Sequence, residues 1–213
     1  KAESQQTLKE NLIKTNNCRV IPSSVIYGAN ASGKSNIIMS LALMREIILS
    51  GSLETNSLDF NNLELYPFAY SDEESPMSFE IEFKNKNHHI IYGFELECKL
   101  FKKDFRKIIS ENLSVILGKS QNIKIFKRNR SKISIMKDKK ALGVIKFSDK
   151  LINEFEDKIN ANLDTSELFL SRAFKSTISN EIAEVVLDFF RNKLIVVSDF
   201  TLKKTNLTFA LDD

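Results

Sequence analysis

Gly28-Ala29-Asn30-Ala31-Ser32-Gly33-Lys34-Ser35 fits the pattern G-x-x-x-x-G-K-[ST] of a phosphate-binding P-loop. The residues on both sides suit this motif. The run Ser23–Tyr27 before it predicts a buried strand, and residues 36–49 after it predict a helix with an apolar stripe at period 3.6. Gly51 is a candidate C-cap for that helix. A strand, a glycine-containing loop and a helix in this order predict a nucleotide phosphate site at the start of the helix.

Each position of the loop has an expected role. Gly28 and Gly33 let the backbone turn tightly and approach phosphates without a Cβ in the way. The amides of residues 31–35 form an anion nest, Lys34 reaches the β- and γ-phosphate oxygens, and the Ser35 hydroxyl holds Mg²⁺. We therefore expect Lys34 to be catalytic, Ser35 to be the metal ligand, and the nucleotide to contact Gly28, Ala29, Asn30, Ala31, Ser32, Gly33, Lys34, Ser35 and Asn36.

Composition sets broad limits on the protein. The 213 residues carry 31 basic and 28 acidic side chains, and this net charge of +3 is too small to predict a nucleic-acid binder by itself. Cys18 and Cys98 belong to no metal-binding or C-x-x-C motif, which favours free thiols in a reducing cytoplasm. The sequence contains no run of 18 apolar residues, so it does not predict a membrane-spanning helix. The chain begins at Lys1, so we expect a segment upstream of it.

The loop variant also carries a resemblance. Asn30, Ala31 and Ser32–Asn36 resemble the G-x-N-x-S-G-K-S-N loop of the ABC-type ATPase heads of SMC, RecF and RecN proteins. Residues 26–36 look closer still to the SMC-like ATPases of bacterial abortive-infection and anti-phage systems, which are distant relatives of the OLD-family ATPases. The resemblance implies an α/β P-loop NTPase of ABC-ATPase type with an additional antiparallel β lobe. It also implies ATP and Mg²⁺ as ligands, ATP hydrolysis between two heads of a dimer or larger oligomer, and a nuclease or toxin effector as partner.

The chain as a whole divides into three parts. Residues 18–50 hold the strand, P-loop and helix, residues 65–147 hold an antiparallel β lobe, and residues 148–213 hold helices and core strands. Alternation predicts strands over 78–83, 89–97 and 111–117, helices follow Ser148 and Ser179, and further apolar strands are expected over 194–198 and 207–211. The acidic stretch from Glu46 to Phe83 contains no Lys or Arg and is expected to be a solvated connection. It also lacks a glutamine for the Q-loop role in ABC-type heads.

Residues 119–146 contain ten basic side chains and one acid, Asp138. The alternating runs 123–127 and 132–137, joined by residues 128–131, predict a hairpin with one basic face. Three interpretations stay open: contact with DNA or RNA phosphates, a solvated hairpin whose lysines protect its edges, or a protein partner. The candidate nucleic-acid contacts are Lys124, Lys127, Arg128, Arg130 and Lys132.

A P-loop alone does not complete an ATPase, because an acid must hold Mg²⁺ and another group must orient the attacking water. Asp199 and Asp212 are weak candidates, and Leu170–Ala173 lacks the glycines of an ABC signature loop. His88 and His89 are adjacent in a strand and face opposite sides, which disfavours a shared metal. We expect the Walker B, signature and switch residues to lie after residue 213. The alternatives are a nucleotide-dependent oligomeric scaffold with little turnover, or a plain nucleic-acid-binding module.

Overall fold

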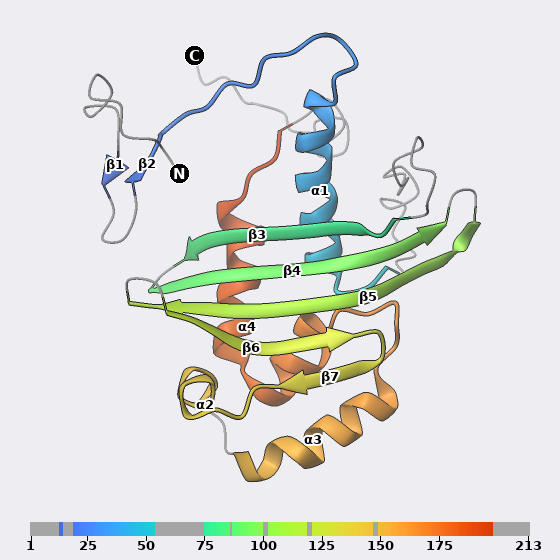
Figure 1. Cartoon of the computed structure of the whole chain (residues 1–213), viewed down its shortest axis with the longest axis vertical. Coiled ribbons are helices and arrows are strands. Elements are labelled where there is room, and N and C mark those ends of the chain that lie inside the picture. The colour runs from blue at the N-terminus through green and yellow to red at the C-terminus, as the bar shows by residue number, and fades with distance from the viewer. Residues whose placement is uncertain are drawn as a thin grey trace, which may run out of the picture.

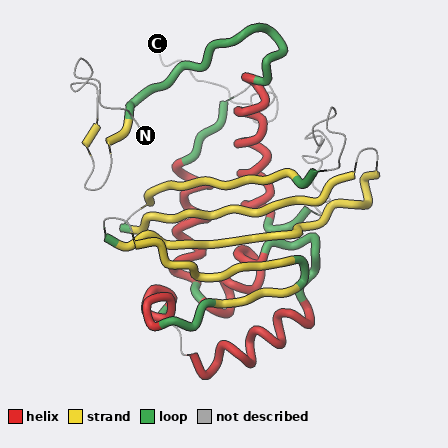
Figure 2. Tube along the Cα trace, viewed as in Figure 1, coloured by secondary structure: helices red, strands yellow, loops and turns green. Residues whose placement is uncertain are grey.

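A computed structural model describes residues 13–14, 19–53, 75–85, 87–99, 102–118, 121–146 and 149–197 (Figures 1 and 2). The strands are β1 (Ile13–Lys14), β2 (Arg19–Val20), β3 (Met77–Asn85), β4 (His88–Lys99), β5 (Lys102–Leu117), β6 (Gln121–Asn129) and β7 (Lys132–Ile135). The helices are α1 (Lys34–Ser50), α2 (Lys139–Ile145), α3 (Asp149–Asn162) and α4 (Asn180–Asp188), with π-helical segments η2 (Leu170–Ile178) and η3 (Phe189–Lys193). None of the helices in these ranges is long and apolar enough to cross a membrane.

Five antiparallel strands in the order β3-β4-β5-β6-β7 form one meandering sheet. Side chains along β3 alternate between the two faces of this sheet, as expected for a strand with one buried face. The even-numbered residues 78–84 are exposed, whereas the odd-numbered Phe83 and Asn85 are buried. The strands predicted over 78–83, 89–97 and 111–117 and the hairpin of residues 123–137 are confirmed by β3 to β7. The resemblance implied an antiparallel β lobe, and this sheet has that architecture.

The helices cover one face of the sheet (Figures 1 and 2). Helix α3 lies along the outer strand β7 instead, where Asn160 Oδ1 accepts the N–H of Ile133 at 2.7 Å and Glu156 Oε1 accepts that of Ile135 at 2.6 Å. These side chains satisfy edge N–H groups that would otherwise be open to another strand. The core between sheet and helices is rich in phenylalanine, including Phe94, Phe126, Phe169, Phe174 and Phe190.

The predicted helix starts are confirmed. Helix α4 begins after Ser179, whose Oγ accepts the N–H of Ile182 at 3.4 Å, and α3 begins at Asp149. The sequence did not predict the π-helical segment η2, which follows the connector at residues 163–169.

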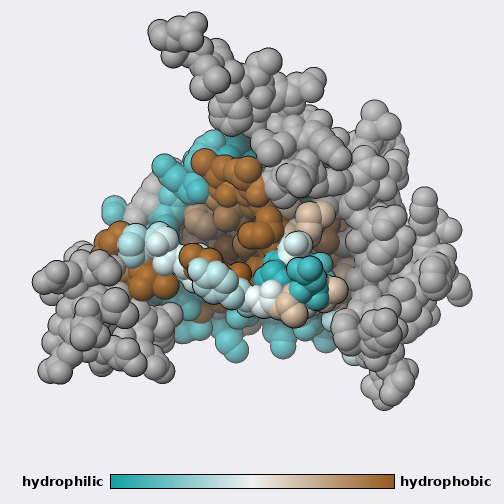
Figure 3. Space-filling view, turned by 90° about the horizontal axis from the view of Figure 1, so that it is seen from above, coloured by the Kyte–Doolittle hydropathy of each residue, from teal (hydrophilic) through white to brown (hydrophobic). Residues whose placement is uncertain are grey.

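Two predicted core strands are wrong in the described structure. Residues 23–27 are extended but pair with no described strand, and Val25, Ile26 and Tyr27 are 68%, 53% and 87% exposed. Residues 194–197 are likewise outside any strand, with Ile195 80% exposed. No described strand runs beside either segment to supply a hydrogen-bonding ladder. Figure 3 shows apolar side chains gathered around a hollow at this end of the molecule. The strand predicted over 207–211 lies outside the described residues.

The end of α1 depends on a left-handed glycine. Gly51 has φ 73° and donates its N–H to the Ile47 carbonyl, and a Cβ there would lie 2.8 Å from Ser171 Cβ. We expect Gly51→Ala to lower the free energy of unfolding by about 1–3 kcal/mol, measured by urea denaturation. Gly143→Ala is the matched control, because Gly143 lies in α2 with no atom within 4 Å of an added Cβ and should tolerate alanine or gain stability. Equal effects of the two substitutions would contradict the prediction.

Candidate functional site

The predicted P-loop forms a tight loop that leads directly into α1. Gly33 is the N-cap of α1 with φ 85°, and Ala31 also has a positive φ of 61°. Gly28 has no positive φ, but a Cβ there would lie 2.8 Å from Ser32 Oγ. Gly33 is therefore favoured by its backbone conformation, whereas a Cβ at Gly28 would only require the Ser32 hydroxyl to rotate away. Ala31 stores strain of the kind found at ligand-binding loops.

The start of α1 is open to an anion. No side chain caps the helix, and its first turn contains no acidic residue. The N–H of Asn36 is taken by the Gly33 carbonyl at 3.0 Å, so Asn36 does not offer this group to a phosphate. The N–H groups of Lys34 and Ser35, which come before Asn36, have no carbonyl one helical turn earlier to accept them, and the helix dipole adds partial positive charge at this end. This end of α1 therefore suits phosphate.

Lys34 lies against the loop that precedes it. Its Nζ donates to the carbonyl of Gly28 at 2.8 Å and to that of Ala29 at 2.5 Å, and it lies 3.4 Å from Ser32 Oγ. The ammonium thus lies against the loop, where phosphate oxygens would replace the carbonyls as its partners. Ser35, the expected magnesium ligand, is exposed in the first turn of α1. The residues present fit a magnesium-bound nucleotide.

The far end of α1 is fixed to the body of the protein. The Gly51 carbonyl accepts the N–H of Leu168 at 2.9 Å, and the N–H of Leu53 bonds to the Ser166 carbonyl at 2.8 Å. Ser171 Oγ donates to the Ile48 carbonyl at 3.0 Å, and Arg45 Nε donates to the Phe190 carbonyl at 2.7 Å. The helix that carries the P-loop is therefore anchored at its C-terminal half to residues 166–171 and to η3.

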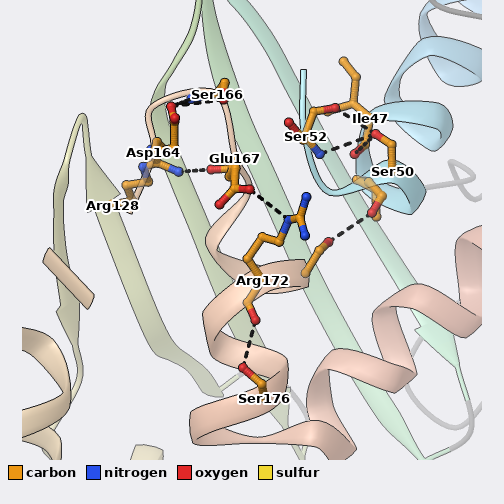
Figure 4. A network of polar contacts seen from close by, with 11 residues as sticks. Ile47, Ser50, Ser52, Arg128, Asp164, Ser166, Glu167, Arg172 and Ser176 are labelled. Atoms are coloured by element: carbon orange, nitrogen blue, oxygen red, sulfur yellow. Dashed lines mark hydrogen bonds and ion pairs between the residues drawn. The ribbon is translucent and has the colours of Figure 1, made fainter. Parts of the chain in front are cut away.

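The connector at residues 164–170 is held in turn by a buried ion pair that sequence analysis did not find. Both side chains are fully buried: Arg128 Nη1 lies 3.8 Å from Glu111 Oε2. The guanidinium also donates to the carbonyls of Asp164 and Glu167 (Figure 4). It donates to the Arg130 carbonyl as well. Burial lowers the pKa of Arg128, while the Glu111 charge acts in the opposite direction.

Glu111 satisfies the other side of this cluster. Its carboxylate accepts the N–H of Phe169 at 2.7 Å, the N–H of Leu170 at 2.9 Å and the hydroxyl of Tyr92 at 2.8 Å. Burial raises the pKa of Glu111 and the pKa of Tyr92. Because the two N–H groups belong to the start of η2, Glu111 fixes that segment on the sheet and, through the connector, supports α1.

The five side chains predicted to contact nucleic acid differ in exposure and pairing. Arg128 is buried in the cluster above, so its prediction as a phosphate contact is wrong. Arg130 is 66% exposed and lies 3.5 Å from Glu97, which offsets its charge. Lys124, Lys127 and Lys132 are exposed on the sheet face that the helices leave uncovered. The basic face of the hairpin is therefore smaller than its sequence indicates.

His88 and His89 do not form a metal site with other residues that the structure describes. His89 Nε2 lies 2.8 Å from Glu82 Oε1, and the Nδ1 atoms of His88 and His89 are buried without a hydrogen-bond partner. Among the described residues, no group of three His, Cys, Asp or Glu side chains could hold a metal ion. Cys18, Asp199 and Asp212 lie outside those residues, as does the side chain of Cys98.

A groove of about 390 Å³ lies between α3 and η2. Phe155, Ile159 and Leu163 supply apolar lining, and Lys158 and Arg172 supply charge. Arg172 is already paired with Glu167 at 3.1 Å. No residue of the P-loop lines this groove, so it is not part of the nucleotide site.

Comparison with known families agrees with the loop geometry. A family model described as "AAA domain, putative AbiEii toxin, Type IV TA system" matches residues 23–183. The chain belongs to this family. Membership makes it an α/β P-loop NTPase of a kind tied to toxin–antitoxin and abortive-infection systems, and AAA domains generally use ATP with Mg²⁺. The matched region includes the P-loop, α1 and the whole antiparallel sheet. No curated protein and no solved structure matches the chain.

Proposed function

We propose that this chain binds Mg-ATP at Gly28–Ser35 and hydrolyses it as the ATPase of a bacterial defence system. The observation that carries this proposal is the uncapped start of α1 with Lys34 Nζ turned over the loop, 2.8 Å from the Gly28 carbonyl. The family supports the same class of activity. Resemblance to SMC-like and OLD-related heads supports a finer role, in which ATP is held between two heads and its hydrolysis controls a nuclease or toxin effector.

The residues of the loop have distinct parts in this reaction. The N–H groups at the start of α1 and the Lys34 ammonium hold the β- and γ-phosphate oxygens. The Ser35 hydroxyl binds Mg²⁺, which neutralises charge that develops on those oxygens. Residues 20–45 contain no Asp or Glu, so the carboxylate that orients the attacking water comes from outside this stretch. Another part of the protein or a second head is the expected source.

Two assays of the full-length protein test the proposal. Calorimetric titration with Mg-ATP measures binding, and phosphate release measures turnover. Ser35→Ala should weaken the magnesium dependence of both, because its hydroxyl is the proposed metal ligand. Ser40→Ala is the matched control. Ser40 lies in the same helix beyond the P-loop, and its hydroxyl donates to the Ile37 carbonyl, so its loss should not change magnesium binding. Binding without turnover would favour the nucleotide-dependent scaffold, and absence of binding would overturn both functions.

The lysines of β6 and β7 offer a separate test for nucleic acid. If they contact phosphates, neutralising three charges should lower duplex DNA affinity and reduce the slope of log K against log salt by about 2–3. We expect this result for Lys124→Gln/Lys127→Gln/Lys132→Gln in fluorescence anisotropy titrations at several salt concentrations. Lys139→Gln/Lys140→Gln, which removes exposed charges from the start of α2, controls for general charge loss. An unchanged slope would favour the solvated hairpin.

A further inference from the structure

The sheet face that the helices leave uncovered, here called the open face, carries opposite charges on its two halves (Figure 1). On β3 and β4 its carboxylates are Glu80, Glu82, Glu95 and Glu97. Strands β6 and β7 contain no Asp or Glu, and their lysines on this face are Lys124, Lys127 and Lys132. Two further lysines lie at opposite ends of the face: Lys84 and Lys107. One half of the open face is therefore mainly acidic, and the other half is basic.

The strand register places three of these carboxylates in rows with three of the lysines. The rows across the sheet are Glu80-Gly93-Asn112-Lys127, Glu82-Ile91-Ser114-Lys124 and Glu95-Ser110-Asn129-Lys132. In each row the carboxylate and the lysine stand three strands apart, about 14 Å at the usual strand spacing. Glu80 and the three lysines have no ion-pair partner among the described residues. Their charges are therefore available to another molecule.

Short side chains occupy the middle of the open face, between the two charged halves. They are Gly93, Ser110, Asn112 and Ser114. A Cβ at Gly93 would lie 2.8 Å from the Phe79 carbonyl oxygen, so this position has no room for a longer side chain. With the nine residues of β3 and five strands, the face measures about 30 Å by about 20 Å, or about 600 Å². Two such faces together reach the lower limit of the area that specific interfaces bury.

We propose that two copies of this chain associate through their open faces, related by a two-fold axis that runs along the strands. This rotation places β3 and β4 of one copy opposite β6 and β7 of the other, so that carboxylates face lysines on both sides of the axis. Sheets that pack face to face lie about 10 Å apart, a gap that glutamate and lysine side chains span from opposite sides. Helix α1, which carries the P-loop, lies on the other face of the sheet, so this contact is separate from the nucleotide site.

The charge pattern favours a second copy over a nucleic acid. The phosphates of a nucleic acid would gain from the lysines alone, and the carboxylates of the same face would repel them. A second copy satisfies both halves at once, because the pattern is complementary to itself after the two-fold rotation. Since the contact is mainly electrostatic, its affinity should fall as salt screens the charges.

Sedimentation velocity of the full-length protein without nucleotide tests this proposal. We expect a dimer at low salt that dissociates when the salt concentration rises or the protein is diluted. Lys124→Glu/Lys127→Glu and, separately, Glu80→Lys/Glu82→Lys should each weaken dimerisation by at least about tenfold, because each places like charges opposite one another. A chain with all four substitutions inverts the pattern but keeps it complementary to itself, so it should dimerise as the wild type does.

Lys139→Glu/Lys140→Glu is the matched control, because it reverses two exposed lysines of α2, outside the sheet, and should leave dimerisation unchanged. An equimolar mixture of the two half-reversed variants should form a heterodimer, which provides a second check if the chain with four substitutions fails to fold. A monomeric wild type at low salt, a dimer that survives both half-reversals, or no recovery in either complementary combination would overturn the proposal. Duplex DNA binding by a monomer would likewise overturn it, if reversal of the lysines abolishes that binding. The absence of nucleotide makes the outcome independent of whether the chain binds or hydrolyses ATP.

Discussion

Replacing Lys34 by alanine should reduce ATP turnover by about 100-fold or more, the loss typical of removing one preorganised group that stabilises transition-state charge. The structure gives the reason: Nζ is held over the loop by the carbonyls of Gly28 and Ala29, at 2.8 and 2.5 Å. A γ-phosphate that enters the loop takes over this ammonium as its charge partner. The measurement is single-turnover phosphate release at saturating Mg-ATP, with affinity determined in parallel by titration.

Two variants control this experiment. Lys34→Arg keeps the charge but replaces a compact ammonium, which donates to the carbonyls of Gly28 and Ala29, with a larger planar guanidinium, so it should restore little turnover. Lys175→Ala removes a lysine of η2 whose Nζ lies 2.5 Å from Glu184 Oε1 of α4. Because Lys175 lies outside the P-loop, this variant should leave turnover unchanged. Turnover that persists in Lys34→Ala would contradict the assigned role and indicate that another nucleotide site or a contaminating enzyme produces the phosphate.

Local patterns predicted the elements that nearby residues determine. The P-loop and α1 follow from the spacing of Gly28, Gly33 and Lys34 and from helical periodicity, and each sheet strand follows from alternation. The cap of α4 at Ser179 was likewise readable from its residue type.

The place of Arg128 was not predictable from alternation, because a bulge changes the parity of β6. Ser114 pairs with Lys124 and Leu113 with Phe126, so Ile125 is the extra residue. Ile125 and Phe126 are both buried, and the positions after them exchange faces. Lys124 therefore points to the open face of the sheet, whereas Arg128, four residues later, points into the core. The strand interpretation of residues 23–27 failed for a different reason, since a strand needs a neighbour that periodicity cannot supply.

The second large effect is expected at Glu111. We expect Glu111→Ala to lower the free energy of unfolding by about 3–5 kcal/mol, because it leaves the Arg128 charge buried without its partner. It also removes the acceptor for the N–H groups of Phe169 and Leu170. Urea denaturation checks the value, and Glu80→Ala, at an exposed position of β3, should change stability by less than about 0.5 kcal/mol. A loss below about 1 kcal/mol for Glu111→Ala would show that the cluster relaxes without its carboxylate.

The pH dependence of Glu111 separates its charge from its hydrogen bonds. Burial raises the pKa of this carboxyl above its ordinary value of 4.5, despite the lowering effects of its N–H donors and of Arg128. The folded state therefore holds the proton more tightly than the unfolded state, and wild-type stability falls as pH rises from the unfolded pKa through the folded one. Glu111→Gln cannot titrate, so the stability advantage of the wild type over this variant should be greatest at pH 4.5 or below and should shrink as pH rises. An advantage that grows with pH would mean that the ion pair with Arg128 outweighs burial, and Glu111 would then stabilise η2 mainly as a charge.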